Sequence, residues 1–144
     1  MKVSGILASK GTTVATIAPG ASVADAADEL RRHGIGALVV STDGRSIDGI
    51  ISERDIVLRL SETGGDVLRQ PVSAVMSAEV QTCSLDDTCD ELMRVMTEQR
   101  TRHLPVMNDG GLAGIISIGD VVKRRVTELE DETRHLHDYI VTGR

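Results

Sequence analysis

The sequence predicts an α+β fold made of two repeats, each a strand–helix–strand–strand–helix unit, packed pseudo-symmetrically and followed by a long C-terminal helix. Three observations predict it. The stretch GIISERD at 49–55 returns as GIISIGD at 114–120, with five of seven residues identical. Apolar residues at helical spacing begin at Val23 and again at Cys89, 66 residues later. From Val122 onward, apolar residues follow a heptad spacing.

The first repeat contains each expected element in turn. A short extended run at 14–16 precedes a helix whose apolar face is Val23, Ala26, Ala27 and Leu30. The pair Ser22 and Asp25 resembles a capping box at the start of this helix. The remaining elements are a strand at 37–40, a turn at 43–44, a strand at 47–52 and a helix entered at 56–57.

The second repeat follows the same order. An extended run at 80–82 precedes a helix with Cys89, Leu92, Met93 and Met96 on its apolar face and a capping box at Thr88 and Glu91. Strands at 103–106 and 112–117 flank a turn, and a helix is entered at 121–122. A unit of about 60 residues buries too little surface to be secure alone, so we expect the two repeats to pack together.

The division of the chain follows from these patterns. Pro71 and a short helical stretch at 72–76 lie between the repeats. We predict a first repeat with its N-terminal segment at 1–71, a second repeat at 72–128 and a helical extension at 129–144. The seam of the last helix consists of Val122, Val126, Leu129, Thr133, Leu136 and Ile140. This seam either lies across the body or packs against another chain, and we favour a homodimer contact.

Composition excludes several classes of function. The net charge of −6 argues against binding a nucleic-acid backbone, and a single Tyr with no Phe or Trp argues against stacking on single-stranded bases. No segment approaches a membrane span, and the apolar run at the N-terminus is too short for a signal peptide. We therefore expect a cytoplasmic protein with neither nucleic acid nor membrane as partner. Cys83 and Cys89 lack a zinc spacing, and we expect no metal site.

The pairs Ser52–Asp55 and Ser117–Asp120 both stand where a strand turns into a helix. One interpretation is structural, because Ser-x-x-Asp before an apolar run is a capping pattern. The other is functional: a helix N-terminus favours phosphate, and an acidic residue there accepts hydrogen bonds from ribose hydroxyls. The repetition of the pattern favours the functional interpretation without excluding the first.

These motifs resemble those of a tandem pair of CBS domains, also called a Bateman module. The resemblance rests on Gly49–Asp55 and Gly114–Asp120, on Arg102-His103-Leu104-Pro105-Val106, and on Pro71–Met76 between the repeats. It covers residues 1 to about 126. It implies a regulatory module that binds adenosine-containing ligands in the cleft between the repeats.

The resemblance also implies the site residues. Asp55 and Asp120 would hold ribose, and Ser52, Ser117 and Arg102 would lie near phosphate. Backbone groups of Thr16, Ile17, Ala18, Thr82 and Cys83 would hold the adenine edge. The first-repeat counterpart of Arg102 is Gly36, which has no side chain, so the two sites are not expected to be equivalent.

Other residues are candidates from their own chemistry and position. Without aromatic rings, adenine would lie between aliphatic side chains, and we expect Ile35, Ile50, Leu104 and Ile115 to line it. Arg54, inside the first motif, and Lys10 are weaker phosphate candidates. His103 is expected to be a structural residue at the start of a strand. No nucleophile with a positioned base is evident.

The expected function is a stand-alone sensor of AMP, ADP or ATP that signals to an unidentified protein partner. NAD(H) and S-adenosylmethionine remain alternative ligands because all of these molecules contain adenosine. Enzyme activity is not expected: CBS pairs occur as inserts in IMP dehydrogenase, but the catalytic barrel of such an enzyme needs about 250 residues. The alternative of another class is a ligand-free adaptor in which the Ser-x-x-Asp pairs only cap helices.

Overall fold

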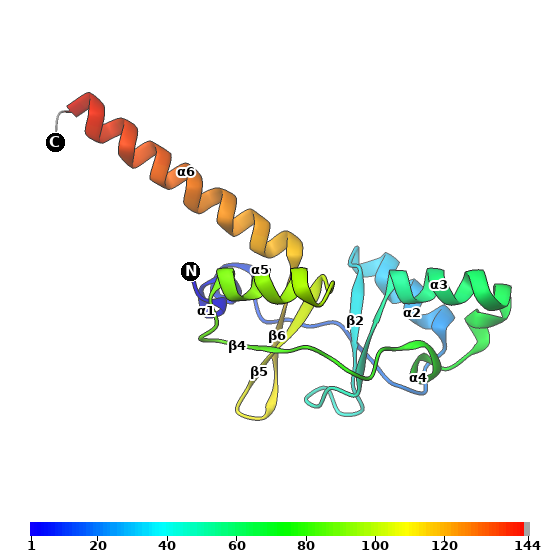
Figure 1. Cartoon of the computed structure of the whole chain (residues 1–144). Coiled ribbons are helices and arrows are strands. Elements are labelled where there is room, and N and C mark those ends of the chain that lie inside the picture. Colours follow the sequence, from blue (N-terminus) through cyan, green and yellow to red (C-terminus); the bar gives the residue numbers. More distant parts are fainter. Residues whose placement is uncertain (143–144) are drawn as a thin grey trace.

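The computed structural model describes residues 1–142 and contains two sheets of three strands each (Figure 1). The first sheet has the order β1 (Thr16–Ile17), β2 (Ala37–Val40), β3 (Gly49–Ser52). The second has the order β4 (Cys83–Ser84), β5 (His103–Asn108), β6 (Gly111–Ser117). In both sheets the first pair of strands is parallel and the second pair antiparallel. The predicted α+β fold of two repeats is confirmed.

The helices that follow β1 and β4 begin at the capping residues that the sequence predicts. In α2 (Val23–His33), Ser22 caps the N-terminus, and Gly34 ends the helix with a left-handed φ of 62°. In α5 (Cys89–Glu98), Thr88 and Glu91 form the complete capping box. The box predicted at Ser22 is only half present, because Ser22 accepts from the backbone of Asp25 without a return bond.

The predicted apolar faces of these helices are largely the buried ones. Val23, Ala26 and Leu30 enter the first core, and Cys89, Leu92 and Met96 enter the second. Met93 differs from its prediction and is 39% exposed. The i+4 residue of an i, i+3, i+4, i+7 stripe lies at the edge of the apolar face and is buried only where the neighbouring element is wide enough to cover it.

Several strand boundaries also differ from the prediction, and β5 and β6 extend the predicted strands to Asn108 and back to Gly111. β1 and β4 lie two to three residues later than the expected runs, because their parallel register pairs Thr16 with Val39 and Cys83 with Val106. β3 begins at Gly49 because the preceding loop is closed by Asp43. The Asp43 carboxylate accepts from the backbone N–H groups of Arg45 and Ser46 and from two serine hydroxyls. The backbone bonds from Ser46 and Arg45 lower the pKa of Asp43 to about 2.

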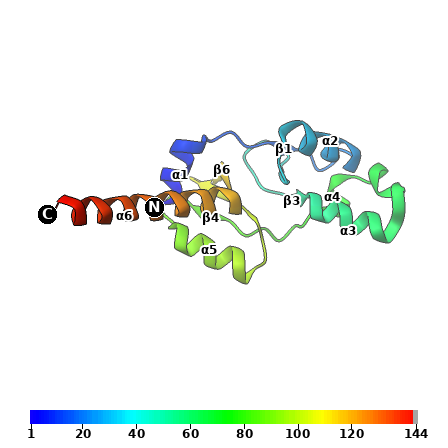
Figure 2. The same cartoon turned by 90° about the horizontal axis from the view of Figure 1, so that it is seen from above.

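Each core takes in one helix from beyond the predicted boundary near residue 71. The helix α1 (Val3–Lys10), which the sequence did not predict, packs in the core of the second repeat through Val3, Ile6 and Leu7. The short α4 (Val72–Val75) packs in the core of the first repeat. Figure 2 shows this exchange, with α1 beside β6 and α4 beside α3. Each half therefore contributes a helix to the core of the other, and these exchanged helices hold the two halves together.

The helices that follow β3 and β6 differ in length. The first is α3 (Glu53–Thr63), which passes into a short 3₁₀ turn, η1 (Gly64–Arg69), whose Val67 is buried. The second is α6 (Ile118–Thr142), one unbroken helix of 25 residues that leaves the body as an arm (Figure 1). Its first turns contact the body through buried Val121 and through Glu128, which pairs with the N-terminal amine. Within residues 1–142, no helix has the length and apolar character needed to cross a membrane.

Candidate functional site

The first Ser-x-x-Asp pair forms a closed cap at the start of α3. Ser52 Oγ accepts from the Asp55 backbone N–H at 3.2 Å, and Asp55 Oδ2 accepts from the Ser52 backbone N–H at 2.8 Å. The Ser52 hydroxyl also donates to Asp55 Oδ2 at 3.0 Å. Both side chains are half-buried.

The second pair repeats this geometry at the start of α6. Asp120 Oδ2 accepts from the Ser117 backbone N–H at 2.8 Å and from its hydroxyl at 2.9 Å, and Ser117 Oγ accepts from the Asp120 backbone at 3.2 Å. The capping interpretation is therefore confirmed for both pairs. It leaves the functional interpretation open, because each cap also holds a carboxylate rigidly at a helix N-terminus.

A backbone bond joins each helix start to the residue that precedes the middle strand of its sheet. The N–H of Glu53 donates to Gly36 O at 2.9 Å, and the N–H of Ile118 donates to Arg102 O at 2.8 Å. Gly36 and Arg102 are thus structural counterparts, as the repeat predicted. The bond holds the backbone of Arg102 at the start of α6, and the side chain of Arg102 is exposed.

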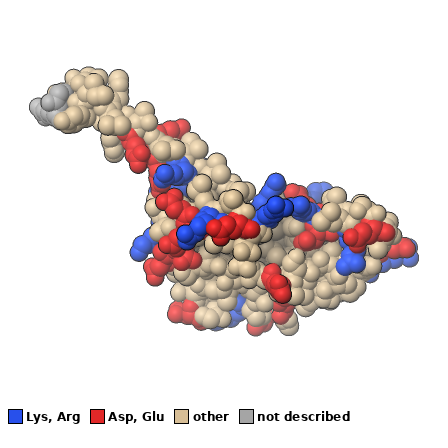
Figure 3. All heavy atoms as spheres, viewed as in Figure 1, with Lys and Arg blue, Asp and Glu red and all other residues tan. Residues whose placement is uncertain are grey.

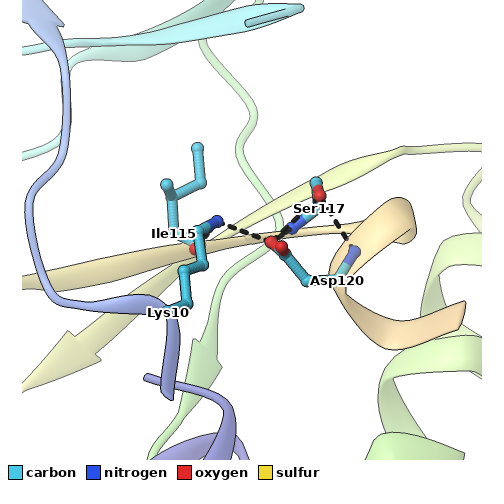
Figure 4. Close-up of polar contacts among 4 residues, drawn as sticks. All are labelled: Lys10, Ile115, Ser117 and Asp120. Carbon is cyan, nitrogen blue, oxygen red and sulfur yellow. Dashed lines mark hydrogen bonds and ion pairs between the residues drawn. The ribbon is translucent and has the colours of Figure 1, made fainter. Parts of the chain in front are cut away.

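Lys10 joins the second site from α1, far away in the sequence. Its ammonium donates to Asp120 Oδ2 at 2.5 Å and to the Ile115 carbonyl at 2.8 Å (Figure 4). Burial alone would raise the pKa of Asp120. The hydrogen bonds from Lys10 and Ser117 outweigh burial and hold that pKa below its ordinary value. The sequence suggested Lys10 as a phosphate ligand but gave no sign of its pairing with Asp120.

The matching position in the first repeat has no such cation. Ile50, the counterpart of Ile115, instead exchanges two backbone hydrogen bonds with Ser77, at 3.0 and 2.9 Å. No ion pair involves Asp55 among the residues that the structure describes. Arg54 is exposed on α3 and has no recorded hydrogen bond to Asp55.

The local charges of the two sites therefore differ. The second site pairs the cation Lys10 with the anion Asp120. The first holds one cation, Arg54, against Glu53 and Asp55. Elsewhere, charges of both signs are mixed over the face of the body seen in Figure 3. The difference is thus a property of the two sites, and it favours a phosphate-bearing ligand at the second one.

His103 lies where the two sites approach each other. Its Cε1 is 3.4 Å from the position that a Cβ on Gly36 would occupy, and Glu53 Oε1 is 3.5 Å from the same position. The missing side chain at Gly36 thus makes room for an imidazole from the other repeat. Burial, with a smaller contribution from Lys10, lowers the pKa of His103. The sequence placed His103 at the start of a strand but did not reveal this contact across the cleft.

The residues predicted to surround adenine are divided by the structure. Ile50 and Ile115 are half-buried, and Ile35 is exposed. Thr16 in β1 is exposed, as are Ala18 after β1 and Thr82 before β4. Ile17 and Cys83 are buried, so only their backbone is available to a ligand. Leu104 differs from the prediction: it is fully buried in the second core, because its side chain points to the helix-covered face of β5.

A hollow of about 540 Å³ lies between α2 and α3 beside the first site. Ile35, Gly36 and Glu53 contribute to its lining together with Leu30 and Val57. Its volume falls within the range of small-molecule sites. Asp55 does not line it, so the hollow adjoins the first site without including the predicted ribose ligand.

Comparison with known proteins identifies the repeats. A model of the CBS domain matches residues 9–62 and 72–127. The chain belongs to the CBS-domain family. The CBS-domain-containing protein ATU1752 from Agrobacterium tumefaciens is 46% identical, with a TM-score of 0.84 over 87% of this chain and 99% of that one. The mitochondrial CBS domain-containing protein CBSX3 from Arabidopsis thaliana is 36% identical over 126 residues.

The coverage of CBSX3 and a ligand-bound CBS structure add to this comparison. The match to CBSX3 covers 85% of this chain but 61% of the relative's length. The CBS domain pair of MJ0100, whose structure was determined in complex with 5′-methylthioadenosine and S-adenosyl-L-methionine, has the same fold at 22% identity and a TM-score of 0.79. CBS pairs are regulatory modules that bind adenosine-containing ligands, and proteins made only of CBS domains are typically regulatory rather than catalytic.

Proposed function

We propose that this CBS pair is a stand-alone sensor of AMP, ADP or ATP, that it binds the nucleotide preferentially at the Asp120 site, and that it signals to a partner protein. The observation that carries the proposal is the ion pair between Lys10 and Asp120 at the N-terminus of α6. A carboxylate suits ribose hydroxyls, while a cation and a helix N-terminus suit phosphate.

Binding of a nucleotide at this site would have to rearrange the Lys10–Asp120 pair. Asp120 Oδ2 already accepts from Lys10 and from Ser117, so a ribose would use the other oxygen or displace the ammonium. Lys10 is then free to turn toward the phosphate. Lys10 is the last residue of α1, and α1 packs in the second core. A movement of Lys10 would therefore couple ligand binding to a change in the position of this helix.

The choice among adenosine ligands rests on the phosphate. S-adenosylmethionine has no phosphate and carries a sulfonium cation, which the second site would repel. NAD(H) carries two phosphates and remains the nearest alternative. The complex of MJ0100 supports adenosine as the shared group of CBS ligands and does not favour a nucleotide over S-adenosylmethionine.

The second candidate function is a ligand-free adaptor. The observation in its favour is that both caps are complete without any ligand. In that case the same residues serve only stability, and the protein acts through its surfaces. Under either function we propose the cytoplasm as the compartment and a homodimer as the assembled form.

Titration calorimetry with AMP, ADP, ATP, NAD, NADH and S-adenosylmethionine tests the proposal. We expect micromolar affinity, about −8 kcal/mol, for a phosphate-bearing ligand. Asp120→Ala should abolish this binding. Asp55→Ala should change it by less if the second site is the preferred one.

The matched control is Glu91→Ala. It removes the acidic member of the capping box of α5, so it costs about as much stability as the loss of a cap at Asp120 but leaves the cleft intact. Circular dichroism would establish that all three variants fold. Heat from none of the six ligands would favour the adaptor, and equal binding by wild-type protein and Asp120→Ala would remove Asp120 from the site.

A further inference from the structure

The outer face of α6 has an apolar seam that nothing in the described chain covers. Val122, Val126, Leu129, Leu136 and Ile140 are between 47% and 75% exposed. Leu129, Leu136 and Ile140 continue along the arm beyond Glu128, which pairs with the N-terminal amine. Val126, Leu129 and Thr133 share one exposed face of the arm with Glu130, Arg134 and His137. An exposed apolar stripe of this length is typical of an interaction surface.

The spacing of the seam fixes the heptad positions. Val126, Thr133 and Ile140 occupy position a, and Val122, Leu129 and Leu136 occupy position d. Buried Val121, which packs against the body, lies one residue before the seam, on a neighbouring face of the helix. A partner helix can therefore approach the seam without displacing the body.

The charges beside the seam change sign along the arm. Positions e and g are Lys123 and Arg125 in the first heptad and Glu130 and Glu132 in the second. His137 and Tyr139 follow in the third. Lys123, Glu130 and Glu132 form no ion pair within residues 1–142, and Arg125 pairs only with Glu128 of its own helix at 3.3 Å.

This order of charges distinguishes a parallel from an antiparallel pair of arms. In a parallel, in-register pair, each g residue faces the e residue of the next heptad on the partner. Arg125 then meets the partner's Glu130, and Glu132 meets the partner's His137. Both pairs occur twice by symmetry. In a fully overlapping antiparallel pair, Glu130 and Glu132 would each face their own copies, which is repulsive.

We propose that α6 forms a parallel, in-register two-stranded coiled coil with a second copy of this chain. The occupant of the seam is then a copy of the seam itself, and the dimer is isologous about an axis along the arms. The two bodies lie at the same end of the pair, and the C-termini lie together at the other. The inference concerns the arm and does not depend on the ligand proposed for the cleft.

A disulfide cross-link tests the orientation in the full-length protein. Thr133→Cys puts a thiol at an a position, where two parallel in-register helices bring equivalent Cα atoms to within disulfide reach. We expect rapid oxidation to a covalent dimer of about twice 15.4 kDa. Cys83 and Cys89 are buried and should stay silent. Asp131→Cys, on the opposite face of the same helix, is the matched control and should stay monomeric on a denaturing gel.

Charge exchange tests the pairing independently. Glu130→Arg should raise the dimer dissociation constant about tenfold, because two attractive pairs become repulsive. Adding Arg125→Glu in the same chain should restore it. Sedimentation equilibrium measures both. A monomeric wild-type protein, an unchanged dimer after deletion of residues 129–144, or equal cross-linking at positions 131 and 133 would each overturn the proposal.

Discussion

The two Ser-x-x-Asp sites have the same backbone geometry but differ in the charged groups around them. Their caps agree in every hydrogen bond, with distances that match within about 0.1 Å. Yet Asp120 is paired with Lys10, while the carboxylate of Asp55 has no cationic partner in the described chain. The repeat therefore reproduces the scaffold of a site but not its charge. What distinguishes the sites is Lys10 at the end of α1, because the residue 66 positions later, after α4, is Met76.

The largest expected difference between the two repeats is in stability, on substitution of Gly49 and Gly114. These glycines are the first residues of the two copies of the motif. A Cβ at Gly49 would lie 2.7 Å from the backbone O of Ser77, and one at Gly114 would lie 2.8 Å from the end of the Leu7 side chain. Side chains give way more easily than backbone does. We expect Gly49→Ala to lower the free energy of unfolding by about 3 kcal/mol and Gly114→Ala by about 1 kcal/mol.

Urea unfolding of the two glycine variants, followed by circular dichroism, measures this difference. Each variant controls for the other, since both add one methyl group at the same motif position. Equal destabilisation would mean that the segment Met76–Ser77 yields as readily as a leucine side chain. The exchanged helix α4 would then hold the first repeat less firmly than α1 holds the second.

A smaller effect is expected when the second site is made to resemble the first. Met76 stands 66 residues after Lys10, the shift that also relates Thr16 to Thr82, so Lys10→Met copies the first repeat. We expect AMP to bind about tenfold more weakly, a change of about 1.4 kcal/mol, because one phosphate contact is lost. Stability should change by less than about 1 kcal/mol, because the ion pair is partly exposed.

Calorimetry with AMP and with adenosine separates the two contributions of Lys10. Adenosine has no phosphate, so its affinity should stay the same or rise as Asp120 becomes free. Lys2→Met is the control, because Lys2 is exposed on the same segment and its nearest carboxylate, Asp86, is 3.9 Å away. Equal loss of affinity for AMP and adenosine would assign Lys10 to the ribose rather than to the phosphate.

The repeated elements could be predicted from the sequence because each carries its own periodic or capping signal. The helix face at Val23 and the glycine cap at Gly34 are local patterns, and the structure confirms both. The helix α1 carries only a weak signal, because Val3, Ile6 and Leu7 are apolar at helical spacing but no side chain caps its N-terminus. The residues it packs against lie far along the chain, from Cys83 to Val121. Tertiary packing, not propensity, makes this segment a helix.

The site was predictable to the same extent. Ser52, Asp55, Ser117 and Asp120 follow from the repeat and form the two caps at the helix starts. The Lys10–Asp120 pair depends on the path of α1, and the contact of His103 with Gly36 depends on how the two repeats pack. Neither relation leaves a pattern in sequence spacing. The prediction that Leu104 lines the adenine was wrong, because Leu104 is fully buried. Strand alternation assigns a side chain to one face of a sheet only when the strand register is known.

The smallest expected effect is a pH dependence that belongs to one repeat only. Burial lowers the pKa of His103, so the unfolded chain takes up a proton at higher pH than the folded protein. Stability is therefore complete above about pH 6.5, the ordinary histidine pKa, and falls as pH drops toward 5.5. Asp120 does not contribute in this range, because its lowered pKa makes its own contribution disappear only in stronger acid.

Urea midpoints at pH 7.5, 6.5 and 5.5 would measure this dependence in wild-type protein and in His103→Gln, which cannot take up the proton. The variant should lose part of the decline, whereas His137→Gln, on the exposed arm, should keep it. The charged groups that face His103 are Lys10 and Arg102, which oppose its protonation, and Glu53 and Asp120, which favour it. An identical decline in wild-type protein and His103→Gln would mean that the carboxylates balance the burial of the imidazole. The cleft would then contribute no difference between the repeats beyond that of Lys10.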